Sequence, residues 1–135
     1  MKSGPATIVA MSSLLLLSGC LTTGGGVTPV QPQPVIRGMQ GGLAGASIGK
    51  ELAANDRRAA LDAEYKALEY TPGGQTVSWK GADQGTSGQV VPGQPYRVGS
   101  QDCRQYTHTI LAGGASESAR GTACRNADGS WTPLT

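Results

Sequence analysis

The sequence predicts an α+β fold in which one short amphipathic helix precedes a small antiparallel meander, or partly closed sheet, stapled by one disulfide. Apolar residues between positions 55 and 70 recur with a helical period, and short β-prone runs separated by Gly, Pro, Asn and Asp fill positions 75–133. Two cysteines lie symmetrically about a Gly-Gly pair. The 135 residues include 21 glycines, 8 prolines and no phenylalanine, so the core must be thin and a covalent staple is expected.

The chain begins with a predicted signal peptide, assigned to residues 1–19. Lys2 supplies a positive charge, and the uncharged run from Ala6 to Leu17 ends in four leucines, as in the apolar core of a secretory signal. As a helix, this run would be only about 18 Å long, whereas the hydrocarbon layer of a membrane is about 30 Å thick. We therefore expect a segment that is removed after export.

The signal peptide ends in Leu17-Ser18-Gly19-Cys20, which resembles the bacterial lipobox: a branched apolar residue and two small residues before a cysteine. Cleavage between Gly19 and Cys20 would leave an N-acyl, S-diacylglycerol cysteine, and several acyl chains hold a protein on a membrane far better than one. The alternative is an ordinary secreted protein with an incidental cysteine. Leu21 stands where Asp retains many enterobacterial lipoproteins on the inner membrane, so we expect a lipid-anchored protein of the outer membrane.

Residues 20–54 are predicted to form the lipidated N-terminus, a Gly/Pro-rich tether and a glycine-zipper segment. The run from Leu21 to Pro34 has no charge and no helical or strand period, which is typical of a flexible spacer. Farther on, Gly41, Gly45 and Gly49 recur every four residues. They allow two interpretations: a helix with a smooth glycine stripe that packs on a membrane or a partner helix, or a flexible, fraying lead into the next helix.

Residues 55–135 are assigned to the folded domain, with a helix at 55–70 and a sheet at 75–133. Asn55 is a good N-cap residue and the following acidic residue suits the first turn. Leu61, Tyr65 and Leu68 form a narrow apolar stripe, so the helix is expected to lie on another element. Thr71-Pro72-Gly73-Gly74 ends it. The β-prone runs that follow are QTVSW, GQVV, PYRV, QYTHTIL, SARGTA and SWT.

The position of Cys103 and Cys124 predicts a disulfide-bonded hairpin. If the two cysteines pair directly, the hairpin centre falls on Gly113-Gly114, the residues that a tight primed turn tolerates best. This register sets Asp102 opposite Arg125, Thr109 opposite Ser118 and Tyr106 opposite Gly121, and all three pairs are compatible. One face then carries Tyr106, Ile110, Ala119, Gly121 and Ala123, with His108 among them. A metal site is the rival interpretation, but the spacing lacks the paired ligands of zinc sites.

Catalytic chemistry has little support in the sequence, and no catalytic, cofactor or metal residues are predicted. His108 is the single histidine and is interpreted as a half-buried packing residue, since no G-x-S-x-G elbow accompanies Ser116 and Ser118. The helix carboxylates and the arginines near the sheet are interpreted as solvated charges; they are Asp62, Glu64, Glu69, Arg97, Arg104, Arg120 and Arg125. Removal of Lys2 leaves ten basic and nine acidic residues, a balance that argues against nucleic-acid binding.

Several motifs resemble the rickettsial seventeen-kilodalton surface antigen and its relatives, small outer-membrane lipoproteins of alphaproteobacteria. The resemblance covers about Gly38 to Trp131 and includes the lipobox, the glycine segment, Asp56-Arg57, Ala60, Ala67-Leu68-Glu69, Gly74, Trp79, Val91-Pro92, Tyr96, Cys103-Arg104-x-Tyr106, Gly113-Gly114 and Gly121-x-Ala123-Cys124-Arg125-x-x-Asp128-Gly129-x-Trp131. Relatives often carry a longer, twofold hydrophobic glycine segment, whereas this chain has one short one. The resemblance implies an envelope location and a structural or antigenic surface role, and it brings no catalytic residues.

The functional hypothesis is a noncatalytic outer-membrane lipoprotein with a structural or surface-antigen role. Its expected partners are the membrane, through the acylated cysteine, and an envelope protein or peptidoglycan-associated protein. The alternative is an envelope binding module, such as a protease or lysozyme inhibitor or a chaperone of envelope assembly.

Overall fold

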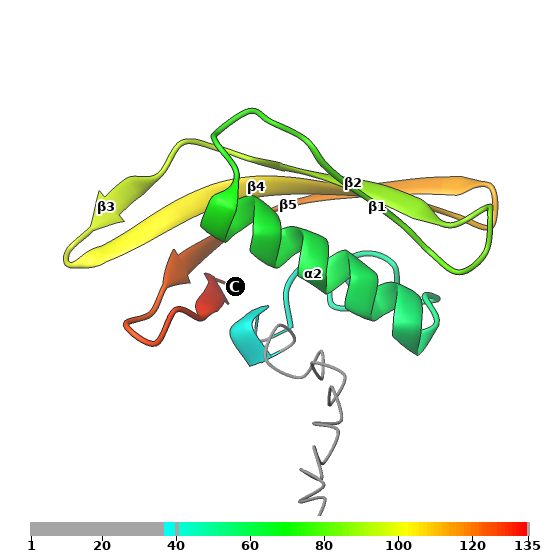
Figure 1. The fold of residues 1–135 in the computed structure, drawn as a ribbon, viewed down its shortest axis with the longest axis horizontal. Helices are drawn as coiled ribbons and strands as arrows, with labels where there is room; N and C mark the ends of the chain where they lie inside the picture. The colour runs from blue at the N-terminus through cyan, green and yellow to red at the C-terminus, as the bar shows by residue number, and fades with distance from the viewer. Residues whose placement is uncertain (1–36, 40, 135) are drawn as a thin grey trace, which may run out of the picture.

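The computed structural model describes residues 37–39 and 41–134, which form one helix packed on one antiparallel sheet (Figure 1). The signal peptide, the lipidation site Cys20 and the tether at 21–34 lie outside the described residues. The elements, labelled as in Figure 1, are α2 (Ala54–Tyr70), β1 (Val77–Lys80), β2 (Ser87–Pro92), β3 (Tyr96–Val98), β4 (Gln101–Ala112), β5 (Ala115–Arg125) and β6 (Trp131–Leu134). In the described part of the chain, no helix has both the length and the apolar character to cross a membrane.

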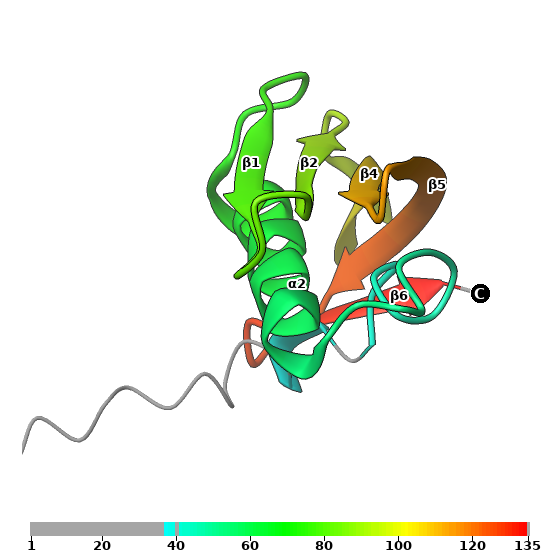
Figure 2. The same ribbon diagram turned by 90° about the vertical axis from the view of Figure 1, so that its right-hand side faces the viewer.

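The sheet confirms the predicted α+β class and the antiparallel meander. Five of its six strands run in the order β1-β2-β4-β5-β6, and the sixth, the short β3, pairs with β4. β2 pairs with Tyr106–Leu111 and β3 with Gln101–Cys103, so both lie along the edge of β4 that β5 leaves open. The sheet curves around α2 (Figure 2), and this curvature gives it a concave inner face and a convex outer face.

The β4–β5 hairpin has the predicted register and the predicted disulfide. Cys103 pairs with Cys124 at a Cα separation of 4.0 Å, and Tyr106 pairs with Gly121. Gly113 and Gly114 have φ angles of 57° and 79°, which a primed two-residue turn requires. Closing this loop contributes about 3 kcal/mol on the chain-entropy model.

Asp102 and Arg125, predicted to lie opposite each other, do not form an ion pair with each other. Asp102 lies 3.5 Å from Arg97 on β3, while Arg125 binds Glu69 on the helix. Side-chain reach decides these partners: an arginine on the inner face extends towards the helix rather than along its own strand pair.

Helix α2 starts one residue earlier than predicted, and Asn55 is not its N-cap. Ala53 occupies the cap position without a side-chain hydrogen bond. The neighbouring Asp56 accepts a 2.8 Å hydrogen bond from the amide of Ala82 in the β1–β2 turn, so this carboxylate ties two elements together. Leu61 and Leu68 are buried as expected, and the small residues Ala60, Ala63 and Ala67 bring the helix close to the sheet.

Residues 41–52, called the strap below, form a folded loop that packs beside α2 on the inner face (Figure 2). The prediction of a helix with a glycine stripe is wrong, because Gly41, Gly45 and Gly49 have φ angles of +84°, +87° and +64°, outside the helical range. The prediction of a fraying lead is also wrong, because four apolar residues of the strap are buried in the core: Leu43, Ala44, Ile48 and Leu52. The glycine repeat therefore permits turns rather than helix contact.

Candidate functional site

The centre of the molecule is a buried carboxylate, Glu64 of α2, whose side chain is fully buried. Its Oε2 accepts a 3.0 Å hydrogen bond from the Leu43 amide, and its Oε1 accepts one of 2.9 Å from the Ala44 amide. From β4, the Tyr106 hydroxyl donates to Oε2 at 3.3 Å and His108 Nδ1 lies 2.6 Å from Oε1. One helix side chain therefore joins the strap to the sheet.

The hydrogen bonds of His108 identify its tautomer. Trp79 Nε1 carries a hydrogen and can only donate, and it lies 2.9 Å from His108 Nε2. Nε2 must therefore accept, so the ring is neutral and Nδ1 carries the hydrogen that is donated to Glu64. The indole reaches across β2 because residue 88 is glycine: a Cβ there would lie 2.4 Å from Trp79 Nε1.

Protonation and access both indicate that this cluster is structural. Burial, and then the Glu64 carboxylate, raise the pKa of Tyr106 well above its usual value, so the hydroxyl stays a donor. His108 and Glu64 have no exposed surface. Ser118 bonds Thr109 on the outer face, whereas His108 lies on the inner face, so the strand pleat separates the serine from the histidine. His108, predicted to be a half-buried packing residue, is completely buried. The prediction that Glu64 is a solvated charge is wrong.

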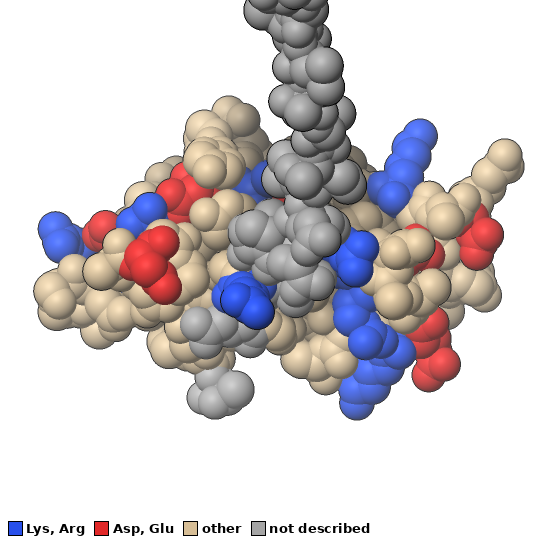
Figure 3. Space-filling view, turned by 60° about the horizontal axis from the view of Figure 1, so that its bottom comes forward, with Lys and Arg blue, Asp and Glu red and all other residues tan. Residues whose placement is uncertain are grey.

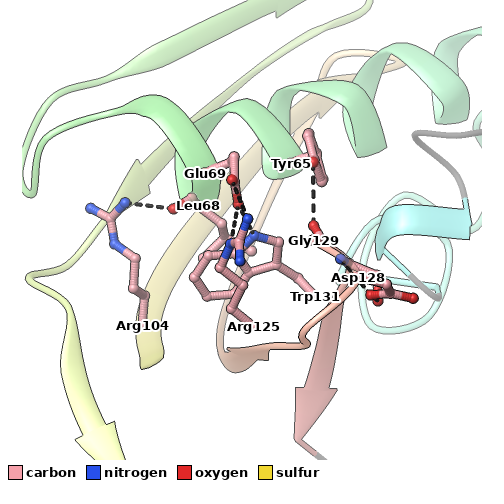
Figure 4. A network of polar contacts seen from close by, with 9 residues as sticks. Tyr65, Leu68, Glu69, Arg104, Arg125, Asp128, Gly129 and Trp131 are labelled. Carbon is pink, nitrogen blue, oxygen red and sulfur yellow. Dashed lines mark hydrogen bonds and ion pairs between the residues drawn. The ribbon is translucent and has the colours of Figure 1, made fainter. Parts of the chain in front are cut away.

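A second polar cluster holds the C-terminal end of α2 (Figure 4). Arg104 of β4 donates from Nη1 to the carbonyls of Ala67 and Leu68 at 3.1 and 2.7 Å, and from Nη2 to that of Thr71 at 2.8 Å. Its Nε and Nη2 also bond the carbonyl of Gly93. The last turn of α2 contains no basic residue, so a cation from the sheet satisfies the free carbonyls and the negative end of the helix dipole. Burial lowers the pKa of Arg104, and its interpretation as a solvated charge is wrong.

A third cluster joins the same end of α2 to β5 and β6 (Figure 4). Arg125 Nε and Nη2 each lie 2.9 Å from a Glu69 oxygen, and Trp131 Nε1 donates to Glu69 Oε2 at 2.8 Å. The Arg125 hydrogen bond lowers the pKa of the Glu69 carboxyl, the Trp131 bond adds to this effect, and burial opposes it. Tyr65 donates to the carbonyl of Gly129 at 3.3 Å. Glu69 is therefore a structural link and not the predicted solvated charge.

The predicted site residues fall into three groups. Gly19 and Cys20 lie outside the described residues, Cys103 and Cys124 form the disulfide, and the three glycines shape the strap. Across 37–39 and 41–134, no group of three or more His, Cys, Asp or Glu residues is arranged to hold a metal ion. The helix side of the molecule carries charges of both signs (Figure 3).

The sequence reasoning missed the Glu64 and Arg104 clusters. One signal was available for Glu64: it lies four residues after Ala60 and four before Leu68, both buried, so it shares a helix face with core residues. A carboxylate on an apolar face needs partners. No comparable signal marks Arg104, because its acceptors are backbone carbonyls that any sequence supplies.

Comparisons with known proteins match the end of α2 and the sheet to a family. Residues 66–132 match the model of the 17 kDa outer membrane surface antigen. The chain is 41% identical over 85 residues to the 17 kDa surface antigen of Rickettsia bellii, covering 62% of this chain and 54% of that protein. It is 46% identical over 77 residues to that of Rickettsia felis, covering 56% and 48%, and 45% identical over 75 residues to that of Rickettsia amblyommatis, covering 55% and 49%.

The chain thus spans about half the length of the curated relatives it matches. No solved structure matches it. The matched region contains Arg104, Arg125 and Trp131 together with both disulfide cysteines. Over residues 66–132, the chain therefore carries the domain of the rickettsial 17 kDa surface antigen family.

Proposed function

We propose that the protein is a noncatalytic lipoprotein of the outer membrane, in which an acylated Cys20 and the tether at 21–34 present the folded domain as a surface antigen. Removal of the predicted signal peptide would precede acylation. The domain itself supplies a stable, stapled surface and carries out no reaction. The expected partners are the membrane that receives the acyl chains and a further protein of the cell envelope.

The observation that carries this proposal is the use of the cysteines. The chain contains three. Cys103 and Cys124 are joined across the β4–β5 hairpin, and the remaining one is Cys20, the last residue of the lipobox. A disulfide between the later two suits an oxidising compartment outside the cytoplasm, the same compartment to which a signal peptide and lipobox direct a protein.

The noncatalytic part of the proposal is supported by the state of the titratable groups. His108 and Glu64 resemble a base and its orienting acid, yet both are fully buried and their ring nitrogens and carboxylate oxygens are occupied by internal hydrogen bonds. A general base must reach the proton that it abstracts. These two side chains have no access to a substrate.

The shape of the domain supports display away from the anchor. Residues 37–39, the first ones described, lie beneath α2 on the side opposite the outer face of the sheet (Figure 1). An anchor that precedes them in the chain would therefore be attached on the helix side, which leaves the outer face of the sheet free for display. That face carries polar side chains along β4 and β5, among them Thr107, Thr109, Ser118 and Arg120.

Metabolic labelling with an alkyne analogue of palmitate tests the anchor. The wild-type chain should be labelled and should sediment with membranes, and Cys20→Ala should lose both properties. A Cys103→Ala/Cys124→Ala double variant is the matched control, because it removes the other two thiols and should keep the label. Equal labelling of the Cys20→Ala variant would refute the proposal.

Protease shaving of intact cells tests display. Cleavage of the wild-type domain on intact cells, with an internal periplasmic marker left uncut, is expected for a surface antigen. If the domain is cut only after the outer membrane is permeabilised, it faces the periplasm and the antigen part of the proposal is wrong.

A further inference from the structure

A small pocket lies at the tip of the β4–β5 hairpin, between that hairpin and the end of the strap. It has a volume of about 130 Å³ and is lined by Gly49, Glu51, Leu52, Ile110, Ala112, Ala115 and Glu117. Leu52 and Ile110 are buried and form an apolar floor. Figure 1 shows the hairpin tip and the first turn of α2 at the same end of the molecule. This pocket is called the tip pocket below.

The backbone of the strap keeps the tip pocket open. Gly49 has a φ of +64°, and a Cβ at this position would lie 2.8 Å from both the Ile110 and the Leu52 methyl carbons. The amide of Gly49 donates a 2.7 Å hydrogen bond to Glu117 Oε2. This bond holds the Glu117 carboxylate at the rim, so the pocket combines a fixed wall with a fixed charge.

The rim is acidic and lacks an internal counterion. Glu51 and Glu117 are both exposed. Among residues 37–39 and 41–134, neither forms an ion pair with a lysine or arginine, although Asp62, Glu69 and Asp102 do. An apolar floor beneath two unpaired carboxylates fits a ligand with an apolar stem and a positive head.

The volume of the pocket limits which apolar stem and positive head can fit. A closed apolar cavity of about 150 Å³ holds benzene, so about 130 Å³ suits a flexible stem of four or five carbons. Lysine has a four-carbon stem and a compact ammonium, and its stem packs on apolar surface while the head stays at the solvent edge. Arginine's planar guanidinium is wider and prefers a flat, bidentate carboxylate.

We propose that the tip pocket binds the lysine side chain of a partner polypeptide. The stem lies against Leu52 and Ile110, and the ammonium lies between Glu51 and Glu117. This contact goes beyond the proposed antigen role and does not depend on the lipid anchor. It identifies the tip of the hairpin as the place where a basic segment of another protein docks.

Methyl NMR of the full chain carrying Cys20→Ala tests the proposal without any requirement for lipid, so its failure is separate from failure of the anchor. The probe is Nα-acetyl-lysine methylamide, and the neutral control is Nα-acetyl-norleucine methylamide, which has the same stem without the charge. The lysine probe should shift the methyl signals of Leu52, Ile110, Ala112 and Ala115 in a saturable manner. A Kd on the order of millimolar is expected for so few atoms.

Variants distinguish the contribution of the two carboxylates to lysine binding from the contribution of the apolar cavity. Glu51→Gln and Glu117→Gln should each weaken lysine binding roughly two- to fivefold, the effect of one partly exposed ion pair, and glutamine can still accept the Gly49 hydrogen bond. Ala115→Leu should abolish binding by filling the pocket. Asp62→Asn, on the exposed side of α2, is the matched control and should leave the Kd unchanged.

Three results would overturn the proposal: no saturable shifts with the lysine probe, equal binding of the norleucine control, or no weakening by either glutamine variant. Equal or tighter binding of Nα-acetyl-arginine methylamide would contradict the assignment to lysine.

Discussion

Replacing Glu64 by alanine should be among the most destabilising single changes in the helix. It would leave the Leu43 and Ala44 amides, the Tyr106 hydroxyl and His108 Nδ1 without their acceptor in the core. Removing one partner of a buried polar cluster costs about 3 to 5 kcal/mol. The total stability of a domain is only about 5 to 15 kcal/mol, so the variant should lie close to the folding limit.

Urea unfolding at pH 7, followed by tryptophan fluorescence, measures this loss. With a slope of about 1.5 kcal/mol per M for a small domain, the midpoint should fall by about 2 to 3 M. Glu64→Gln should lie between wild type and alanine, because the amide keeps one acceptor but turns its NH₂ towards a donor. Asp62→Asn is the control: its ion pair with Lys66 is exposed and should change stability by less than about 0.5 kcal/mol.

Hydrogen exchange locates the effect. In Glu64→Gln, which should remain folded, the amides of Leu43 and Ala44 should lose protection more than those in the centre of β4. A loss below about 1 kcal/mol in Glu64→Ala, or unchanged protection of the strap amides in Glu64→Gln, would show that Glu64 does not hold the strap.

Three further predictions follow from single contacts. Arg104→Leu should destabilise the domain by about 2 to 4 kcal/mol, because the helix carbonyls lose a buried charged donor; thermal unfolding measures this. A Cβ at residue 42 would lie 1.9 Å from Glu64 Oε2, so Gly42→Ala should cost at least about 2 kcal/mol in urea, whereas Gly85→Ala meets nothing within 4 Å and should be neutral. The pKa of Glu69 in the folded protein lies below its usual value, so the stability that its carboxylate adds is complete above about pH 4.5 and is lost as the pH falls through the folded pKa. The free energy of unfolding of Glu69→Gln should therefore approach that of wild type on acidification. A difference in unfolding free energy that stays constant with pH would contradict the assignment.

The sheet was more predictable than the strap because the information lies in different places. Alternation along β4 and the symmetric cysteines predicted the register of the hairpin, since pairing depends on residues that face each other across one turn. The glycine repeat at 41–49 was ambiguous, because glycine serves both close helix packing and left-handed turns. Burial of Leu43 and Ile48 against the core selected the turns.

The sequence by itself determined the order of the elements, the turn at Gly113-Gly114 and the Cys103–Cys124 bridge, all of which depend on local spacing. Only the tertiary structure decided the environment of the charges. Glu64 meets Leu43 at a separation of 21 residues and His108 at 44, and Arg125 meets Glu69 at 56. The sequence does not distinguish a solvated carboxylate or guanidinium from a buried one, because its partners are set only when the helix packs on the sheet.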